Sequence, residues 1–423
     1  MVRTAGGSVT RIETKEELNT LAVIRNHFAL PALLLALAAA GVAQTEGATK
    51  IYRDGSCWVQ ETTGTLPASR YIKIHTNAGG VSVAGAQQSN ITYMIRKRVS
   101  ASSEDNARRL FENLRVIANR QGDAAYFGGE GGDNWHRGSV EFNITTPRSV
   151  DVIKAKTDGG SLRFTHLNGR VDAESGGGNV DLDDINGSVT ASTGGGSINV
   201  GTVNADLGIR TGGGRVNIGT VGGKLNASTG GESVRVDNVK RDAVIETGGG
   251  NIYVQNVGGD LRGSTGGGNI EVGSVAGTMD VETGGGSIRL TGGSAGAIRA
   301  QTGSGSIHCV KITRSVRAET GAGGITAEFM TMNGKFSDSV LDTGVGDIIV
   351  YLPSDLKVSV HASIDVATTR DAIRSELPGI HIESEGGDYG PREMSAEGDL
   401  NGGGPTLKLH TSTGKIQFIA LKK

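Results

Sequence analysis

The sequence predicts an all-β protein: a single-stranded β-solenoid (β-helix) of about ten 18-residue coils with a cap at each end. The first observation is a column of Thr and Ser residues that recurs every 18 residues from Thr157 to Thr283. The second is glycine, which supplies 69 of the 423 residues, about twice its ordinary share. The third is a set of short alternating apolar runs between the glycines, typical of strands with one buried face. One coil cannot bury that face alone, so the coils must stack.

A typical unit of the repeat, such as Thr193–Arg210, begins with Thr, and its second to fourth positions are mostly glycine. The glycines predict a tight turn that requires positive φ or close backbone approach. Apolar residues occupy the sixth, eighth, eleventh and usually the fifteenth position, so the predicted strands point these side chains inward. The Thr column predicts a stacked ladder of hydroxyl groups, and Cys309 falls in the eighth column as a core residue. The repeat region is predicted to span residues 151–349.

Residues 44–150 are predicted to form a small α+β cap. The expected elements are a degenerate first coil, a strand, a helix capped by Ser102 or Ser103, a glycine loop and a second strand, at His75–Gly85, Ile91–Val99, Ala107–Ala118, Gly128–Gly132 and Ser139–Pro147. Such a cap would cover the apolar end of the first coil and its unpaired strand edges.

Residues 350–423 are predicted to form a β-rich C-terminal cap. Longer strands are expected in Asp347–Pro353, Lys357–Val366 and His381–Glu385, followed by a polar loop from Gly386 to Gly404. The closing Thr411–Leu421 repeats the coil pattern once more. The lysines at the end of the chain are typical of a protected strand edge.

The first 43 residues are predicted to be a leader and signal peptide. Phe28–Ala43 is a run of sixteen uncharged, mostly apolar residues, short for a membrane span, and Gly41–Ala43 offers the small residues that signal peptidase requires. Arg25 and His27 supply positive charge before it. We hypothesise that translation begins near Val23, because the polar stretch before the apolar run is unusual for a signal peptide. A membrane anchor is the alternative; export to the periplasm, cell surface or medium is the expectation.

Composition excludes several classes of protein. A chain with 36% hydrophobic residues can bury a core, and a formal net charge of −2 without a basic stripe argues against a nucleic-acid partner. Cys57 and Cys309 are too few and too distant for a disulfide framework or a metal cluster. They are either two separate buried thiols or one pair formed in an oxidising compartment.

Three chemical motifs are rejected as functional sites. Gly292–Gly296 matches G-x-S-x-G, but it lies between predicted coils rather than in a strand–turn–helix. The glycine triplets are not followed by Lys-Ser/Thr, so they indicate turns rather than phosphate loops. Asp181, Asp183 and Asp184 suggest calcium, but the Asp181 column continues with Asn and Arg instead of recurring Asp, which favours a solvated face.

A carbohydrate-active β-helix enzyme is the main enzymatic alternative, since such enzymes place carboxylates and basic residues on adjacent coils. The outward seventh column mixes positive, negative and neutral side chains: Arg163, Asp181, Asn199, Asn217, Arg235, Tyr253, Glu271, Arg289 and His308. The eighteenth column carries acidic residues separated by other types: Glu174, Glu246, Glu282 and Glu319. Neither column shows a catalytic cluster. The basic run Arg96-Lys97-Arg98 indicates a solvated strand edge, with contact to an anionic envelope polymer as the alternative, and Trp58 and Trp135 indicate core residues of the cap.

The chain resembles a known family in three stretches. These are the TGGGxIxV coils, VGDIIVYLPSDLKVSVHASIDV (Val345–Val366) and NGGGPTLKLHTSTGKIQFIA (Asn401–Ala420). They are similar to the bacterial "putative adhesin" β-strand-repeat family, a domain family of unknown function, over about residues 70–423. The resemblance implies a β-solenoid outside the cytoplasm. It offers no catalytic residue to transfer, and some relatives are linked to envelope-stress systems.

The function expected from the sequence is therefore a non-catalytic extracytoplasmic β-solenoid that acts as an adhesin-like or cell-envelope scaffold. No catalytic, cofactor-binding or metal-ligating residue is expected, no cofactor is expected, and no binding residue is assigned. The expected partner is an envelope component, protein or polysaccharide, with no nucleic acid and no membrane span after signal cleavage. The alternatives are the carbohydrate-active enzyme, an envelope-stress sensing partner and a polymer-forming scaffold.

Overall fold

A computed structural model describes residues 45–131, 138–331, 336–385 and 392–421. The chain divides into two units, Met1–Ala43 and Gln44–Lys423, and the described residues all belong to the second. The predicted signal peptide Phe28–Ala43, the start near Val23 and Trp135 lie outside the described residues. Within the described residues, no helix has both the length and the apolar character needed to cross a membrane.

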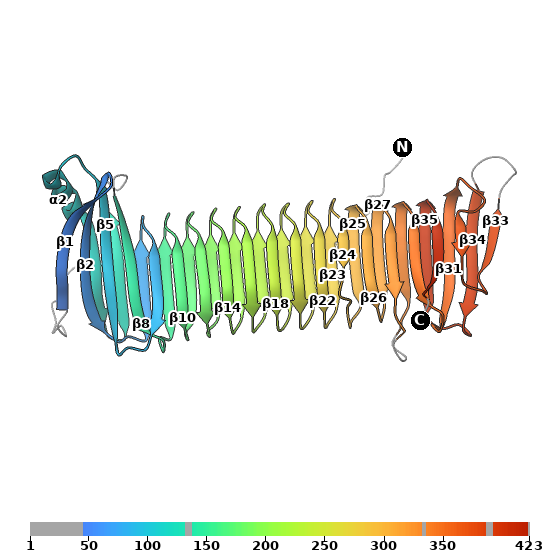
Figure 1. Cartoon of the computed structure of the whole chain (residues 1–423), viewed down its shortest axis with the longest axis horizontal. Coiled ribbons are helices and arrows are strands. Elements are labelled where there is room, and N and C mark those ends of the chain that lie inside the picture. Colours follow the sequence, from blue (N-terminus) through green and yellow to red (C-terminus); the bar gives the residue numbers. More distant parts are fainter. Residues whose placement is uncertain (1–44, 132–137, 332–335, 386–391, 422–423) are drawn as a thin grey trace, which may run out of the picture. The chain divides into compact units, whose positions relative to one another are not determined.

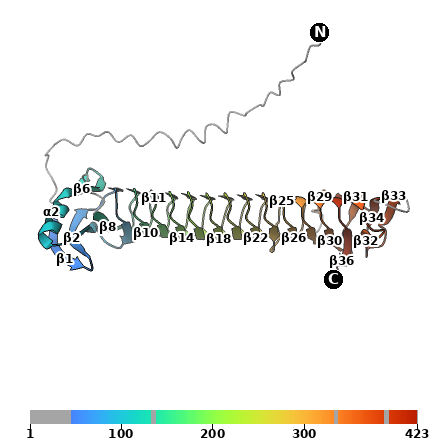
Figure 2. The same cartoon turned by 90° about the horizontal axis from the view of Figure 1, so that it is seen from above.

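The second unit is a stack of flat coils, which confirms the predicted β-solenoid. Its strands lie side by side in a long row (Figure 1), and seen from above they form two facing layers (Figure 2). Each coil gives one strand to each layer, so the coil has two sides, a number that the sequence left open. We call the two layers sheet A and sheet B; over the described part of the chain, each contains 18 strands.

Successive pairings define the order of strands along each sheet. From its first edge, sheet A consists of β1 (Thr45–Asp54), β2 (Cys57–Pro67), β5 (Asn90–Ser100), β8 (Gly138–Pro147), β4 (Val81–Ala86), β10 (Leu162–Leu167), β12 (Val180–Ile185), β14 (Ile198–Val203), β16 (Val216–Val221), β18 (Val234–Val239), β20 (Ile252–Val257), β22 (Ile270–Val275), β24 (Ile288–Leu290), β26 (Ile307–Ile312), β28 (Ile325–Phe329), β30 (Ile348–Pro353), β36 (Ile416–Leu421) and β32 (Ile373–Ser375).

Sheet B follows the same course on the other side of the coils. It consists of β6 (Leu114–Gln121), β7 (Ala124–Gly131), β3 (Tyr71–Thr76), β9 (Val152–Thr157), β11 (Arg170–Ser175), β13 (Val189–Thr193), β15 (Leu207–Thr211), β17 (Leu225–Thr229), β19 (Ala243–Thr247), β21 (Leu261–Thr265), β23 (Met279–Thr283), β25 (Ile298–Ser304), β27 (Val316–Ala322), β29 (Ser339–Val345), β35 (Thr406–Thr413), β31 (Val358–Ala367), β34 (Arg392–Leu400) and β33 (His381–Glu385). The helix described is α2 (Glu104–Asn113).

The repeated strands pair in parallel with an offset of one repeat. Ile198, for example, lies between Val180 and Val216 of the adjacent coils. The inward side chains of both sheets are buried and form one continuous core between the sheets. Because the offset equals the repeat, each apolar column of the sequence becomes a column in space, with neighbours about 4.8 Å apart.

The Thr column joins neighbouring coils through backbone groups. The Thr211 hydroxyl is buried; it donates to the carbonyl of Gly196 in the preceding coil at 2.8 Å and accepts the N–H of Gly214 at 3.1 Å. Thr193 and Thr283 make the same two contacts. The predicted stack of hydroxyl groups is present, because Thr193, Thr211 and Thr229 pair in register on adjacent coils. The hydroxyl groups bond to backbone rather than to one another, since adjacent coils are about 4.8 Å apart whereas the neighbouring carbonyl is within reach.

The glycines after each Thr allow coils to approach closely. A Cβ on Gly194 would lie 2.1 Å from the Gly176 carbonyl oxygen, and one on Gly196 would lie 2.1 Å from that of Gly178. A Cβ on Gly195 would meet nothing within 4 Å. None of the three has positive φ. Close approach, rather than left-handed backbone, is thus the reason for glycine at the second and fourth positions.

The first coil of the chain does not lie at the end of the stack. It consists of β3 and β4, which confirms the degenerate coil predicted at His75–Gly85. β3 pairs with both β7 and β9, and β4 pairs with both β8 and β10. The coil β7/β8, which comes later in the sequence, therefore lies outside it. We call such a coil, placed between two coils that are not both its sequence neighbours, an intercalated coil.

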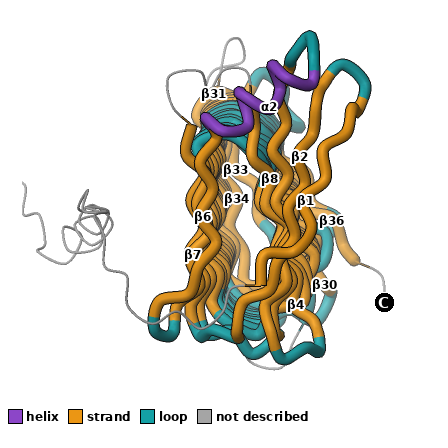
Figure 3. The backbone as a smooth tube through the Cα atoms, turned by 90° about the vertical axis from the view of Figure 1, so that its left-hand side faces the viewer, coloured by secondary structure: helices purple, strands orange, loops and turns teal. Residues whose placement is uncertain are grey.

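The N-terminal cap closes the stack beyond β7/β8. α2 crosses this end (Figure 3), where its Ala107 and Phe111 are buried among β2, β5 and β6. Ser103 caps the helix by accepting the N–H of Asn106. The predicted extension of the helix to Ala118 is wrong, because residues 114–121 form β6. Buried residues four apart fit both a helix face and one face of a strand, so their spacing could not separate the two.

The glycine loop predicted at Gly128–Gly132 is also wrong over its described part. Gly128–Gly131 belongs to β7, where Gly128 and Gly129 pair with β3. A Cβ on Gly129 would lie 3.2 Å from the Phe142 ring, so glycine here makes room for an aromatic side chain of the cap.

The last coil of the chain is intercalated as well. β35 pairs with β29 and β31, and β36 pairs with β30 and β32. This confirms that Thr411–Leu421 contributes to a further coil. The predicted loop Gly386–Gly404 is wrong in part, because Arg392–Leu400 forms β34, which pairs antiparallel with β31. The reason is that β31 would otherwise leave its outer edge unpaired.

A histidine connects this last coil to both of its neighbours. Nδ1 of His410 lies 2.9 Å from an Asp342 oxygen on β29, and Nε2 lies 3.2 Å from the Asp365 oxygens on β31. The pKa of His410 is raised, chiefly by its hydrogen bond to Asp342 and further by Asp365, although burial opposes the rise. The same contact with His410 lowers the pKa of Asp365. Both ring nitrogens can donate only in the protonated form, so these contacts favour imidazolium.

Candidate binding surface

The outer face of sheet A carries an open trough of about 550 Å³. It crosses the strands from β10 to β18, so it runs along the stack over five consecutive coils. Its first wall is the outward seventh column of the repeat, from Arg163 to Arg235. Its second wall is the ninth column, which is interrupted where Gly201 and Gly219 lack side chains. The trough exists because two adjacent coils have glycine at that position.

The first wall is a chain of side-chain hydrogen bonds between coils. Arg163 donates to Asp181 at 3.1 Å, and Asn199 donates its amide to the same carboxylate at 3.0 Å. Asn217 in turn donates to the Asn199 oxygen at 3.0 Å. Each residue orients the next, so this wall is preorganised for hydrogen bonding.

The β16–β18 end of the trough keeps free polar atoms. Within the described residues, the Asp237 carboxylate makes no hydrogen bond or ion pair, and the Asn217 oxygen accepts none. The Arg235 guanidinium carbon lies 4.9 Å from the centre of the Tyr253 ring. The Tyr253 hydroxyl accepts a hydrogen bond from Asn251 at 3.1 Å, which orients the ring. Donors and acceptors are therefore available here to a ligand.

The three aspartates considered for calcium have separate partners. Asp181 faces the trough and pairs with Arg163, whereas Asp183 accepts the Thr202 N–H at 3.1 Å. Asp184 has a positive φ of 49° and accepts a hydrogen bond from His166 at 2.7 Å. Among the described residues, no group of three or more His, Cys, Asp or Glu side chains is arranged to hold a metal ion.

The remaining candidates for catalysis have structural contacts. Ser294, in the G-x-S-x-G match, is buried and donates to the Gly277 carbonyl at 2.9 Å. In the eighteenth column, Glu174 pairs with Lys156 at 2.8 Å. Glu319 of the same column accepts a hydrogen bond from Gln301 and pairs with Arg317.

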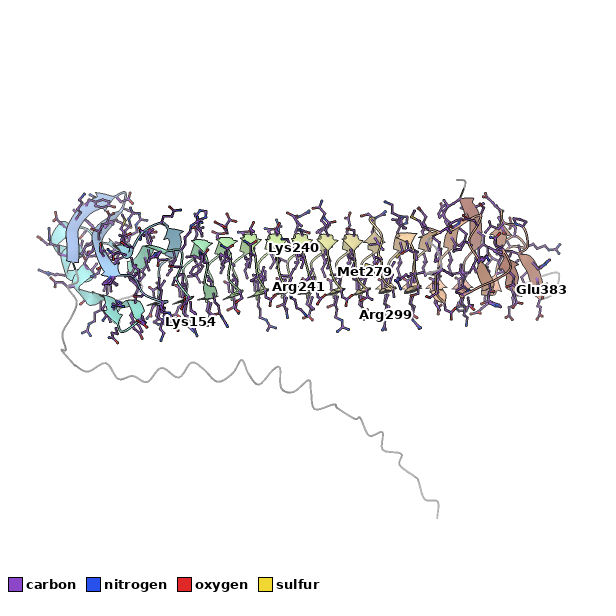
Figure 4. All side chains as sticks on the ribbon, turned by 90° about the horizontal axis from the view of Figure 1, so that it is seen from below. Lys154, Lys240, Arg241, Met279, Arg299 and Glu383 are labelled. Atoms are coloured by element: carbon purple, nitrogen blue, oxygen red, sulfur yellow. The ribbon has the colours of Figure 1, made fainter. Side chains whose placement is uncertain are left out.

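A second hollow of about 360 Å³ lies on the outer face of sheet B. Arg299 lines it and projects outward, as Lys154 does further along the same sheet (Figure 4). Arg299 donates to Gln301 at 3.2 Å, and Arg317 pairs with Glu319 at 2.5 Å. These cations are already engaged, so this hollow offers a ligand less than the trough does.

The basic run on β5 belongs to the cap, and the predicted solvated strand edge is wrong, because β5 pairs with β2 on one side and with β8 on the other. Arg96 and Arg98 pair with Glu61 and Asp54 of the neighbouring hairpin. Lys97 donates to a carbonyl near the end of α2 at 3.1 Å, where a cation is favourable to the helix dipole, and burial lowers the pKa of Lys97. The run therefore stabilises the junction between helix and sheet.

Cys309 and the described tryptophan are core residues. Cys57 and Cys309 are both free thiols, so no disulfide joins them, but Cys57 is half-buried rather than buried. Cys309 is fully buried, as its column predicted, and burial raises its pKa to about 12. Trp58 packs against the core of the cap, which confirms its predicted role.

Sequence reasoning placed the seventh column on the outer face but missed the trough. The available signal was the ninth column, in which Gly201 and Gly219 interrupt a series that includes Thr165, Asp183 and Asp237. A glycine on an outward strand position weakens the strand and often marks close approach by a ligand or another backbone.

No protein-family model matches this chain, and no curated protein matches it. Among solved structures, it is similar to a "putative cell adhesion protein" from Clostridium sporogenes, with 11% identity and a TM-score of 0.19 over 86% of this chain and all (100%) of that one. A "putative adhesin" from Parabacteroides merdae has 13% identity and a TM-score of 0.23 over 68% and 92% of the two chains. A "putative lipid binding protein" from Parabacteroides distasonis has 9% identity and a TM-score of 0.21 over 86% and 98%. At these TM-scores the similarities carry no argument about function.

Proposed function

We propose that this protein is an exported, adhesin-like binding protein of the cell envelope that performs no catalysis. The observation that carries the proposal is the trough on sheet A, whose wall is preorganised by hydrogen bonds from Arg163 to Asn217 and whose far end keeps free polar atoms. Stacked coils give such a surface a rigid support, which is how solenoids present extended binding faces.

Electrostatics supports binding rather than bond cleavage. Glycoside hydrolysis requires two carboxyl groups a short distance apart, one of them with a raised pKa. Along the trough, Asp181 pairs with Arg163 and Asp183 caps a backbone N–H, while Asp237 lies three coils beyond Asp183 at about 4.8 Å per coil. The carboxylates are thus engaged or too distant to act on one bond.

Two measurements on intact cells that produce the protein test this proposal. Protease added without lysis should digest the solenoid, detected by antibody, while a periplasmic control protein survives. The purified protein, fluorescently labelled, should bind saturably to intact cells that lack its gene. Protection from protease until the envelope is opened would replace the adhesin-like function with a periplasmic scaffold, and absence of saturable binding would contradict a binding function.

A further inference from the structure

We propose that the trough on sheet A binds a neutral, hydroxyl-rich linear polysaccharide. The polysaccharide lies along the stack, and Asn217, Arg235 and Asp237 at one end of the trough bind its hydroxyl groups. This inference rests on the proposed binding function and names its ligand class. The combination of one amide, one guanidinium and one carboxylate at the same end of a trough supplies both donors and acceptors to neighbouring hydroxyl groups.

The charge of the trough excludes polyelectrolytes. Its charged lining residues are two arginines and three aspartates, Arg163, Arg235, Asp181, Asp183 and Asp237. Arg163 is neutralised by Asp181 at 3.1 Å. A polyanion requires a run of cations, and a polycation requires a run of acids. This surface has neither, so an uncharged chain avoids the desolvation of unpaired charge.

The shape of the trough favours a polysaccharide over a peptide. A peptide that adds to a sheet needs a free strand edge, with pockets for alternate side chains. The trough instead lies on the face of sheet A, where its second wall is lowered at Gly201 and Gly219 and the Asp183 carboxylate turns in over Gly201, 2.1 Å from the place of a Cβ there. An open face with polar side chains along its length fits a ribbon-like chain of sugar rings, whose hydroxyl groups point sideways.

The direction of the trough favours a polymer over a single sugar. Its first wall repeats one hydrogen-bonding side chain per coil, from Asp181 through Asn199 to Asn217. Adjacent coils are about 4.8 Å apart. Successive sugar units of an extended chain can therefore meet equivalent groups on successive coils, and weak contacts add along the chain.

The test uses the purified full chain and three soluble polymers: hydroxyethyl cellulose as a neutral glucan, guar galactomannan as a second neutral chain, and polygalacturonate as an anionic one. Binding is measured by affinity electrophoresis and isothermal titration calorimetry. We expect at least one neutral polymer to bind, with little change between low and high salt, and polygalacturonate not to bind.

Matched variants place the site. Asn217→Ala removes a wall amide, and Asn226→Ala removes an exposed amide from sheet B as its control. Gly201→Thr fills the trough, and Thr already occupies this column at Thr165; the new Cβ would lie 2.1 Å from Oδ1 of Asp183, so that carboxylate must turn away from the Thr202 N–H. Its control is Gly208→Thr on sheet B, where a Cβ would meet no atom closer than 4.0 Å. Each trough variant should weaken binding about tenfold, and each control should leave binding unchanged.

Three outcomes would overturn the proposal. The ligand class is wrong if neither neutral polymer binds or if only polygalacturonate binds. The site is wrong if a neutral polymer binds but Asn217→Ala and Gly201→Thr bind as well as wild type, with melting temperatures that show both to be folded. Saturable binding to intact cells, if it persists in the absence of polymer binding, would leave the proposed function in place and remove only this inference.

Discussion

The centre of the stack and its two ends relate sequence to space in different ways. From β11 to β28, each coil lies between the coils that precede and follow it in the chain. At the N-terminal end, the first coil β3/β4 lies between β7/β8 and β9/β10. At the C-terminal end, the last coil β35/β36 lies between β29/β30 and β31/β32. The first and the last coil are thus both enclosed by coils from elsewhere in the sequence.

The two ends of the stack are held together by different side-chain contacts. The N-terminal end has a core of aromatic rings: Tyr93 and Phe127 have centroids 5.5 Å apart, and Phe127 and Phe142 have centroids 6.3 Å apart. The C-terminal end has His410 between two aspartates. The comparison teaches that a solenoid can repeat indefinitely by local rules, whereas stopping it requires contacts between distant segments. We expect a substitution in the centre to lower the stability of the fold only by the interactions that it removes. We expect the loss of a segment from either end to unfold that whole end.

The largest expected effect comes from deletion of residues 405–423, which removes an internal coil rather than an edge. The deleted side chains include Leu407, Leu409, Ile416 and Phe418, all essentially buried. At about 1.5–3 kcal/mol for each, the loss of stability should be on the order of 6 kcal/mol or more. Circular dichroism during thermal unfolding and limited proteolysis should show an unfolded C-terminal end.

Deletion of the edge strand β1 is the matched comparison. Among the described strands β1 pairs with β2 alone, so its removal exposes one new edge and leaves every described coil in place. We expect a much smaller fall in melting temperature. Equal losses of stability from the two deletions would contradict the distinction between intercalated and edge elements.

The second largest loss of stability is expected from Gly196→Ala, in the centre of the stack. Its Cβ would lie 2.1 Å from the Gly178 carbonyl oxygen, so adjacent coils must separate, at a cost of about 1–3 kcal/mol. Gly195→Ala, one residue away and open to space, should be neutral or stabilising by about 0.5 kcal/mol. Urea unfolding of both variants measures the difference; similar values would mean that close approach of the coils is not what requires glycine.

A smaller effect is expected from Thr211→Val. The change keeps the shape of the side chain but leaves the Gly196 carbonyl and the Gly214 N–H without this partner, which should cost about 1–2 kcal/mol. Thr211→Ser should retain most of the stability, since Ser175 makes the same contacts in its own coil. Denaturant midpoints compare the two, and a serine variant as unstable as valine would show that the methyl group matters more than the hydroxyl.

The smallest effect concerns the C-terminal end and pH. Because the folded-state pKa of His410 is raised, its contribution to stability is fully present below about pH 6.5 and is lost as pH rises through the raised value. The lowered pKa of Asp365 acts at the other limit, where its contribution is lost on acidification below about pH 4. Both aspartates are about half exposed, so solvent limits the effect to under about 1 kcal/mol.

Melting temperatures at pH 6 and pH 8.5 test this contribution. Wild type should be less stable at the higher pH, and His410→Gln should lose that difference. His381→Gln, on the exposed edge strand β33, is the control and should behave as wild type. A pH difference that survives in His410→Gln would assign it to another group.

Much of the central fold could be predicted because it is local. Ile198, Val216 and Val234 recur every 18 residues, which predicts one buried column, and the structure places them in register. The end elements were predicted less well because their patterns are ambiguous. Leu114 and Ala118 satisfy a helix and a strand equally, and only the pairing of β6 with β7 decides between them.

The trough shows the same limit for a functional surface. Asn199 and Asn217 were placed on the outer face from their column, but a hollow depends on what is missing beside them, at Gly201 and Gly219. Whether two glycines form a hollow depends on which coils are adjacent and on where the flanking Asp183 side chain lies. That side chain turns to the Thr202 N–H, a contact between coils that no single repeat contains.

The sequence by itself determined the repeat, the inward and outward columns and the need for caps, because these follow from periodic burial of apolar side chains. The tertiary structure alone decided that the coil has two sides, that the Thr hydroxyls bond to backbone, and that the first and last coils are intercalated. The physical reason is the separation along the chain of the residues that are in contact. The periodicity of the sequence reflects contacts between neighbouring coils. The pairing of β35 with both β29 and β31 instead depends on strand edges that become available only when distant parts of the chain have folded.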